Sequence, residues 1–236
     1  NRHFKKTQIK SENLDDLETL KMDIRELLNK LTSKTYSAIN EQIHEKMNNL
    51  SETQLQFISP IIFDISSSNL FFSKEYAMLF ESLINKYPMI LSLFKSKLSE
   101  YLGVFKNIEW VSSVEDYDKY CEINKINSKR KALSGFFSNL MLMGIIPAIN
   151  ILRIVLILQQ KINVCISEGT TPIIEEIVEN ICIIMNIIYK KLDKENDQVK
   201  IIIDNIKQII DTNNNVINNK ITFKYMDILD NLNIEY

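Results

Sequence analysis

Glycine and proline are scarce in this chain: each occurs four times in 236 residues. Folds rich in β-strands, and mixed α/β folds, need many tight turns, which draw on glycine at positive φ and on proline. A helical array needs few such turns. The composition therefore predicts an all-α fold. The chain is also rich in Ile, Asn and Lys, a bias typical of an AT-rich genome such as that of a protist or a large DNA virus.

Cysteine and histidine are rare too. Cys121, Cys165 and Cys182 are too few and too scattered for a disulfide framework or a zinc site, and they fit a reducing compartment. Cys165 and Cys182 lie among isoleucines and are predicted core thiols. His3 and His44 have no partners at metal-ligand spacing, and His44 is predicted to be solvated on the polar side of its helix.

Motifs for catalysis are missing as well. The sequence has no glycine-rich phosphate loop and no Gly-x-Ser-x-Gly nucleophile turn. Its acidic pairs are adjacent residues, which point about 100° apart on a helix and do not converge on one substrate. We expect no enzymatic activity and no cofactor.

The chain also lacks a large excess of one charge sign and lacks long apolar runs. The net charge is −2, which produces no strong field toward nucleic acid or an anionic membrane. The most apolar run, residues 145–158, is interrupted by Pro147, Asn150 and Arg153, and is too short and polar to span a bilayer. The N-terminus has no apolar signal-peptide core. We expect a soluble, cytoplasmic protein.

Helical periodicity runs through most of the sequence. Apolar residues recur at spacings of three and four, which places them on one face of successive helices. The first two sets are Leu17, Leu20, Ile24, Leu27, Leu28 and Leu31, and then Tyr36, Ile39, Ile43 and Met47. Further helices are expected near residues 52–66, 73–87, 88–106, 129–143, 147–167, 172–192, 195–212 and 221–232.

Polar residues and breakers suggest where several of these helices begin and end. Thr32 or Ser33 is expected to cap the second helix, and Ser128 the helix at 129–143, which Gly144 ends. The stretch 106–128 is the least regular. It is expected to be a longer loop with a helical turn near residues 116–124.

About ten helices in consecutive pairs of roughly 40 residues are typical of a HEAT-type solenoid. A single helical bundle is the rival architecture, but ten helices do not share one bundle core. We predict an N-terminal extension at residues 1–13 and a single HEAT-repeat domain at 14–236, with about five antiparallel helix pairs.

Lys129, Arg130 and Lys131 form a basic cluster at the start of a predicted helix. Cations there oppose the helix dipole, which favours a functional role. A salt bridge to the acidic run at residues 115–118 explains the cluster equally well.

Residues 24–36, IRELLNKLTSKTY, resemble the start of the middle domain of eukaryotic translation initiation factor 4 gamma, the scaffold of the cap-binding complex. The family's proline after the threonine is Ser33 here, and its usual phenylalanine is Tyr36. The matching residues are Ile24, Arg25, Leu28, Asn29, Lys30, Leu31 and Thr32. Looser resemblances follow in the same order at residues 68–83, 128–146 and 222–232, so the likeness extends from about residue 15 to residue 232.

The resemblance implies a crescent of five HEAT repeats that binds a DEAD-box RNA helicase of the initiation factor 4A type and stimulates its ATP turnover. Carried over, the helicase-binding positions are Leu28, Leu31 and Tyr36, although both leucines also fit the core stripe. Weak RNA contact would rest on Lys129, Arg130 and Lys131. A cap-binding protein would be reached through flanking segments outside this chain.

Two alternatives remain open. A related middle-domain scaffold could act in nonsense-mediated decay, splicing or translational repression. An RNA-binding module without a helicase partner is the other, although the slightly acidic net charge argues against it.

Overall fold

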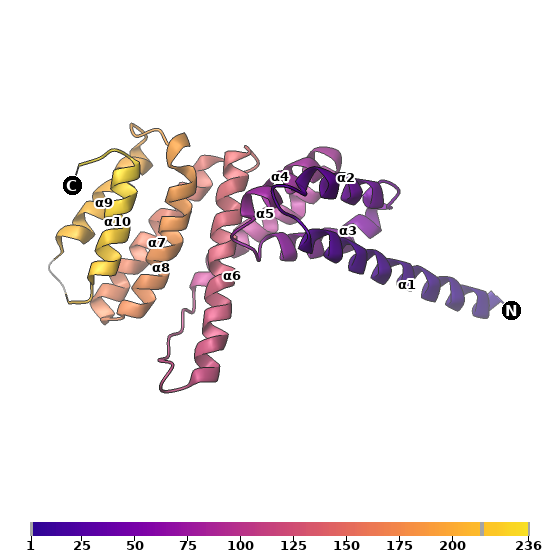
Figure 1. Ribbon diagram of the computed structural model, residues 1–236, viewed down its shortest axis with the longest axis horizontal. Helices are drawn as coiled ribbons and strands as arrows, with labels where there is room; N and C mark the ends of the chain where they lie inside the picture. The colour runs from indigo at the N-terminus through magenta and orange to yellow at the C-terminus, as the bar shows by residue number, and fades with distance from the viewer. Residues whose placement is uncertain (1, 213–214, 236) are drawn as a thin grey trace. The chain divides into compact units, whose positions relative to one another are not determined.

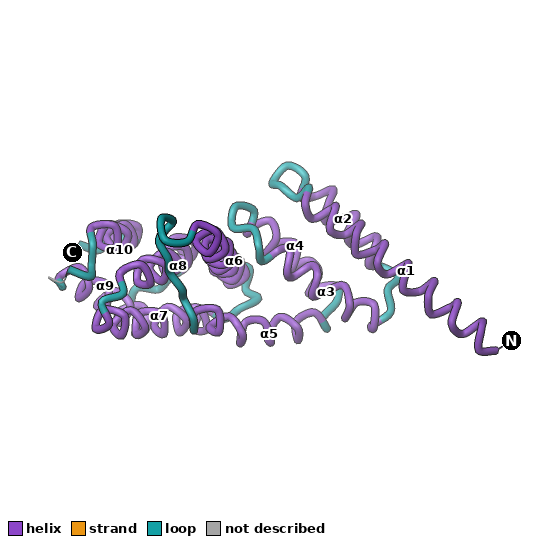
Figure 2. Tube along the Cα trace, turned by 90° about the horizontal axis from the view of Figure 1, so that it is seen from below, coloured by secondary structure: helices purple, strands orange, loops and turns teal. Residues whose placement is uncertain are grey.

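The computed structural model describes residues 2–212 and 215–235, with side chains from residue 16 onward. All regular elements in those residues are helical, which confirms the all-α prediction (Figures 1 and 2). The α-helices are α1 (Arg2–Asn29), α2 (Tyr36–Met47), α3 (Glu52–Ser66), α4 (Ser73–Lys86), α5 (Ile90–Tyr101), α6 (Tyr117–Leu142), α7 (Ala148–Glu168), α8 (Thr171–Ile188), α9 (Asp197–Asp211) and α10 (Asn219–Asn231). Two 3₁₀ turns, η1 (Leu102–Phe105) and η2 (Tyr189–Lys191), follow α5 and α8.

The main difference from the sequence-based expectation is the length of α6. This helix begins at Tyr117, because the Asp116 carboxylate accepts a hydrogen bond from the Lys119 amide at 2.9 Å and caps it. Ser128 lies inside the helix, where its hydroxyl donates to the Asn124 carbonyl at 2.8 Å. The predicted cap at Ser128 is therefore wrong, and the expected loop shortens to residues 106–116.

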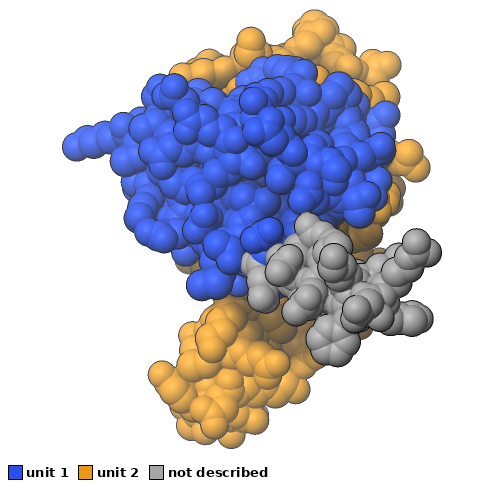
Figure 3. All heavy atoms as spheres, turned by 90° about the vertical axis from the view of Figure 1, so that its right-hand side faces the viewer, with its two compact units in different colours: residues 1–95 blue, residues 96–236 orange. Residues whose placement is uncertain are grey.

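The chain divides into two compact units, residues 1–95 and 96–236, and the division falls within α5 (Figure 3). The predicted boundary after residue 13 lies inside α1. A single repeat domain from residue 14 stays a prediction.

Unit 1 is built around the apolar faces of α1 to α4. Helix α1 packs against α2 and α3, and α4 packs against α2 and α3. Phe63 of α3 lies in the centre, with ring centroids 6.0 Å from Phe80 and 6.3 Å from Phe94, both in edge contact. The Tyr76 hydroxyl of α4 donates to the buried Leu28 carbonyl at 2.9 Å and so ties α4 to α1.

Helix α8 is the centre of unit 2. It packs against α6, α7 and α10, and it is apolar around most of its circumference, as expected for a helix covered on several sides. Cys165 of α7 and Cys182 of α8 are buried, which confirms the prediction of core thiols. Burial raises the pKa of Cys182 to about 12.

Gly144 ends α6 as predicted. Its φ is 77°, its amide donates to the Met141 carbonyl, and the Ile145 amide donates to the Leu140 carbonyl, each at 3.0 Å. This pattern closes a helix through a residue in the left-handed region, where glycine is preferred.

Gly144→Ala is expected to destabilise unit 2 by about 1 kcal/mol, because a Cβ is disfavoured at this φ. A Cβ on Gly144 meets no atom within 4 Å, so the cost is conformational rather than steric. Gly103→Ala is the matched control: it too has open space, but no positive φ, and it is expected to be neutral or slightly stabilising. Urea unfolding followed by circular dichroism measures both, and equal effects would contradict the conformational explanation.

Candidate functional site

The corner between α1 and α2, residues 30–35, carries the sequence motif singled out above. The Thr32 amide donates to the Thr35 hydroxyl oxygen at 2.8 Å, and that hydroxyl donates to the Lys30 carbonyl at 2.6 Å. Thr35 is the N-cap residue of α2, and its side chain makes no capping bond. The predicted cap at Thr32 or Ser33 is therefore wrong. The two threonines instead hold the corner in a compact turn.

Leu28 and Leu31 lie in the core of unit 1, with exposed fractions of 0% and 1%. Neither side chain reaches the surface of the unit. The exposed side chains at this corner are Asn29, Lys30, Ser33 and Lys34. The two leucines therefore shape the corner from inside, and its surface is polar and basic.

Tyr36 is half-buried at the first position of α2. Burial raises the pKa of its phenol, and the Glu81 carboxylate of α4 raises that pKa further. The side chain is thus partly covered, close enough to Glu81 of α4 to feel its charge, and remains partly accessible. Of the three predicted helicase-binding residues, Tyr36 alone has accessible side-chain surface.

His44 occupies a site that the sequence did not reveal. Its Nε2 hydrogen-bonds with the Ser82 hydroxyl of α4, and its ring stacks on Tyr87 with centroids 6.2 Å apart. The prediction of a solvated histidine is wrong, because α2 packs its polar edge against the end of α4. Burial lowers the pKa of His44, and the nearby Lys86 lowers it further.

The basic cluster at residues 129–131 lies in the middle of α6, because that helix begins at Tyr117. The argument from an unfavourable helix dipole therefore does not apply. The predicted salt bridge to the acidic run at residues 115–118 is also wrong, because Arg130 and Lys131 pair with Glu176 of α8 instead. The three side chains of the cluster have different surroundings.

Arg130 is buried, with 2% of its side chain exposed, and pairs with the buried Glu176 carboxylate of α8 at 3.1 Å. Its Nε also donates to the Val104 carbonyl at 2.9 Å, and its guanidinium lies 5.7 Å from the Phe105 ring centroid. Asn127 accepts a further hydrogen bond from the guanidinium. Arg130 is therefore committed to the interior of unit 2 and does not present its charge to solvent.

Lys129 is exposed, and Lys131 is partly exposed with its Nζ 3.4 Å from Glu176. The surface contribution of the cluster is therefore smaller than its sequence suggests. Of the three predicted RNA-binding residues, Lys129 and Lys131 reach solvent.

The ion pair continues into a buried polar network between α5, α6 and α8. The Asn180 amide donates to Glu176 at 3.0 Å, and the Ser134 hydroxyl donates to the Asn180 carbonyl oxygen at 2.7 Å. The Tyr101 and Ser134 hydroxyls hydrogen-bond to each other. Burial raises the pKa of Tyr101 despite this bond and the nearby Arg130 charge. All of these groups belong to unit 2.

Helix α7 is the one described helix that is long and apolar enough, by length and composition, to cross a bilayer. It packs against α8 and α9 and buries Leu152, Val155, Leu158 and Ile162. Core helices of globular proteins meet the same criterion, so α7 carries no conclusion about a membrane.

The described side chains contain no group of three or more His, Cys, Asp and Glu residues placed to hold a metal ion. No protein-family model matches the chain, and no curated protein matches it.

Arg130→Met is expected to destabilise the protein by about 3 kcal/mol, because it leaves the Glu176 carboxylate buried without its buried cation, with the Asn180 amide and the partly exposed Lys131 as its partners. Lys129→Met, one residue away on the same helix, is expected to change stability by less than about 0.5 kcal/mol, since Lys129 is exposed. Chemical unfolding followed by circular dichroism gives both values.

The double variant Arg130→Met/Glu176→Met tests whether the lost stability comes from the unpaired Glu176 carboxylate. If the cost comes from an unpaired buried charge, the double variant is expected to recover part of the lost stability. A double variant no more stable than Arg130→Met alone would contradict this explanation.

The lowered pKa of His44 predicts that the stability of the protein depends on pH. A histidine with a lower pKa in the folded state binds its proton more readily when unfolded, so stability falls as the pH drops below about 6.5, the ordinary value. His44→Gln is expected to flatten this part of the stability curve, and Lys86→Gln to reduce its slope, because Lys86 contributes to the shift. Thermal unfolding across this pH range tests both, and parallel curves for wild type and His44→Gln would exclude the effect.

Proposed function

We propose that this protein is a HEAT-repeat scaffold of the translation-initiation type, which binds a DEAD-box RNA helicase of the 4A type in the cytoplasm and stimulates it. The observation that carries the proposal is the Leu-Asn-Lys-Leu-Thr sequence at residues 28–32, located at the corner between two packed helices. The resemblance to the middle domain of initiation factor 4 gamma rests chiefly on this stretch.

Helix packing within each unit supports the finer proposal of stacked helix pairs. Consecutive helices contact one another in α1 with α2, α3 with α4, α7 with α8, and α9 with α10. Short loops join the members of each pair. Paired consecutive helices are the building block of HEAT repeats.

At the corner between α1 and α2, buried residues have a structural role and accessible residues have the proposed binding role. Leu28 and Leu31 hold α1 in the core of unit 1 and thereby position the turn. Tyr36, with part of its ring accessible, and the exposed Lys34 are the side chains that we assign to contact with the helicase. Tyrosine is among the residue types most enriched among interface anchors.

The proposed mechanism needs no catalytic residue in this chain. A scaffold that binds the closed arrangement of the two helicase lobes better than the open one shifts the population toward the closed state. When one body engages both lobes, the second contact becomes intramolecular and gains from effective concentration.

The test is the ATPase rate of a 4A-type helicase at saturating RNA, with and without this protein. We expect stimulation, and we expect Tyr36→Ala to weaken helicase binding by roughly tenfold or more, the effect of removing an aromatic anchor. Lys34→Glu is expected to weaken binding without affecting stability, because Lys34 is exposed.

Lys95→Glu is the matched control, since it reverses an exposed lysine on α5 of the same unit. Circular dichroism and thermal unfolding establish that each variant is folded. Absence of stimulation by the wild-type protein, or equal stimulation by Lys34→Glu, Tyr36→Ala and the control, would refute the proposal.

A further inference from the structure

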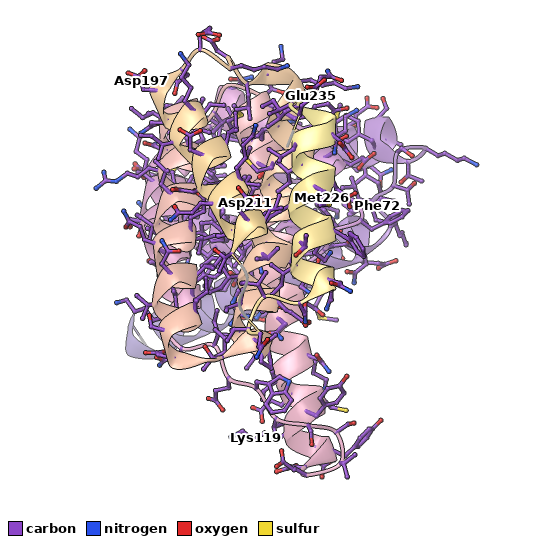
Figure 4. The ribbon with its side chains drawn as sticks, turned by 90° about the vertical axis from the view of Figure 1, so that its left-hand side faces the viewer. Phe72, Lys119, Asp197, Asp211, Met226 and Glu235 are labelled. Atoms are coloured by element: carbon purple, nitrogen blue, oxygen red, sulfur yellow. The ribbon has the colours of Figure 1, made fainter. Side chains whose placement is uncertain are left out.

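The first turns of α6 and the loop before them extend beyond the ends of α7 to α10 within unit 2 (Figures 1 and 4). We call residues 107–123 the α6 tip. Lys119, labelled in Figure 4, lies at its far end. The tip takes no part in the buried network or in the helicase corner, so the inference about it is independent of the proposed function.

The tip exposes large apolar side chains. Val114 is 93% exposed, Tyr117 67%, Trp110 57% and Tyr120 37%. Single exposed apolar residues are ordinary on a protein surface, but several gathered in one short segment and surrounded by charged residues mark an interaction site. Trp and Tyr are also the residues most enriched among interface anchors.

The tip is held in place by its own contacts. Glu109 of the loop pairs with Lys119 of α6 at 3.0 Å, and Asp116 caps the helix. Ser112 and Glu115 exchange hydrogen bonds between side chain and backbone amide, at 3.4 and 3.2 Å. The exposed rings are therefore presented by an ordered segment, which reduces the entropy cost of binding.

The base of the tip is anchored in the core of unit 2. Ile108 and Ile123 are buried, with exposed fractions of 9% and 8%. The Lys161 ammonium of α7 donates to the Lys106 carbonyl at 3.1 Å and also to the Phe105 carbonyl. The loop thus lies against the helices, while its outer side chains remain in solvent.

The charge of the tip indicates what it binds. Residues 107–123 carry five carboxylates and one lysine, a net charge of −4, whereas the whole chain carries −2. The one lysine, Lys119, is already paired with Glu109. This field repels phosphates, anionic lipids and a second acidic tip, and it attracts cations.

We propose that the α6 tip binds a basic, partly apolar segment of another protein, with Trp110, Tyr117 and Tyr120 receiving apolar side chains and arginine. Arginine suits both features of the tip, because its guanidinium pairs with carboxylates and also stacks on aromatic rings. Asp118 and Glu122 are exposed one helical turn apart in the same first turns of α6, and they supply charge on the face next to that of the tyrosines.

Binding at the tip can be measured with a fluorophore that the chain itself contains. Trp110 is the single tryptophan, so its fluorescence reports on the tip alone. The probe is an amphipathic peptide of arginine, leucine and alanine, titrated into the full chain. We expect a saturable blue shift of the emission and an affinity that falls as salt increases, and no shift with the same peptide carrying glutamate in place of arginine.

Two pairs of substitutions separate charge from apolar contact. Asp118→Asn/Glu122→Gln and Val114→Ser/Tyr117→Ser are each expected to weaken peptide binding by roughly tenfold. Their controls are Asp204→Asn/Asp230→Asn and Phe223→Ser, which change exposed residues of α9 and α10 in the same unit and are expected to leave affinity within about twofold. Thermal unfolding verifies that every variant is folded.

Three results of the binding experiments would overturn the proposal. The first is the absence of binding by both fluorescence and calorimetry, and the second is equal affinity in tip variants and controls. The third is a preference for oligouridine RNA or the acidic peptide over the basic one. Sedimentation of the free protein adds a further check, because self-association abolished by Val114→Ser/Tyr117→Ser would identify a second copy, rather than a basic segment, as the occupant.

Discussion

The rest of unit 2 depends on one buried ion pair, that between Arg130 of α6 and Glu176 of α8. Removing either charge from water is costly, and the cost is offset when every remaining donor and acceptor has a partner. Here the guanidinium also bonds the Val104 carbonyl, and the carboxylate also accepts from Asn180. A purely apolar contact between two helices tolerates small shifts along their axes, whereas this pair requires both side chains at one level. The ion pair therefore selects one register of α6 on α8, and α8 in turn contacts α7 and α10.

Local patterns were sufficient to predict most helices and much of the core. The stripe that includes Ile24, Leu28 and Leu31 is buried because spacings of three and four place it on one face of α1. The helical turn expected near residues 116–124 is present as the first turns of α6, but its continuity with the helix at 129–143 was not predicted, and the reason is local as well. Asp116 lies in a run of acidic and aromatic residues with no apolar periodicity, so nothing in the sequence indicates that it caps a helix. Once the helix extends to Tyr117, the lysines and arginine near residue 130 belong to its middle, and the meaning of their charge changes.

Long-range partners account for what the sequence could not predict. Arg130 and Glu176 are 46 residues apart, and His44 and Ser82 are 38 apart. Nothing at either position distinguishes a paired side chain from a solvated one, because the distinction arises from which helix faces pack together. The same limit applies to the α6 tip. The sequence predicts an irregular stretch there, but it does not show that the aromatic side chains of this stretch are exposed. Exposure, unlike periodicity, is a property of the assembled fold.

The uneven charge of unit 2 connects the tip to the question of RNA contact. Lys129 follows Glu122 by seven residues, about 10 Å along the axis of α6, which is close to the screening length at physiological salt. The carboxylates of the tip therefore reduce the attraction of Lys129 for a phosphate mainly at low ionic strength, while Glu176 competes for Lys131. A basic segment on the tip would neutralise part of that charge, so its binding and any RNA contact at Lys129 would strengthen each other. Because such coupling is reciprocal, RNA would strengthen binding at the tip by the same factor.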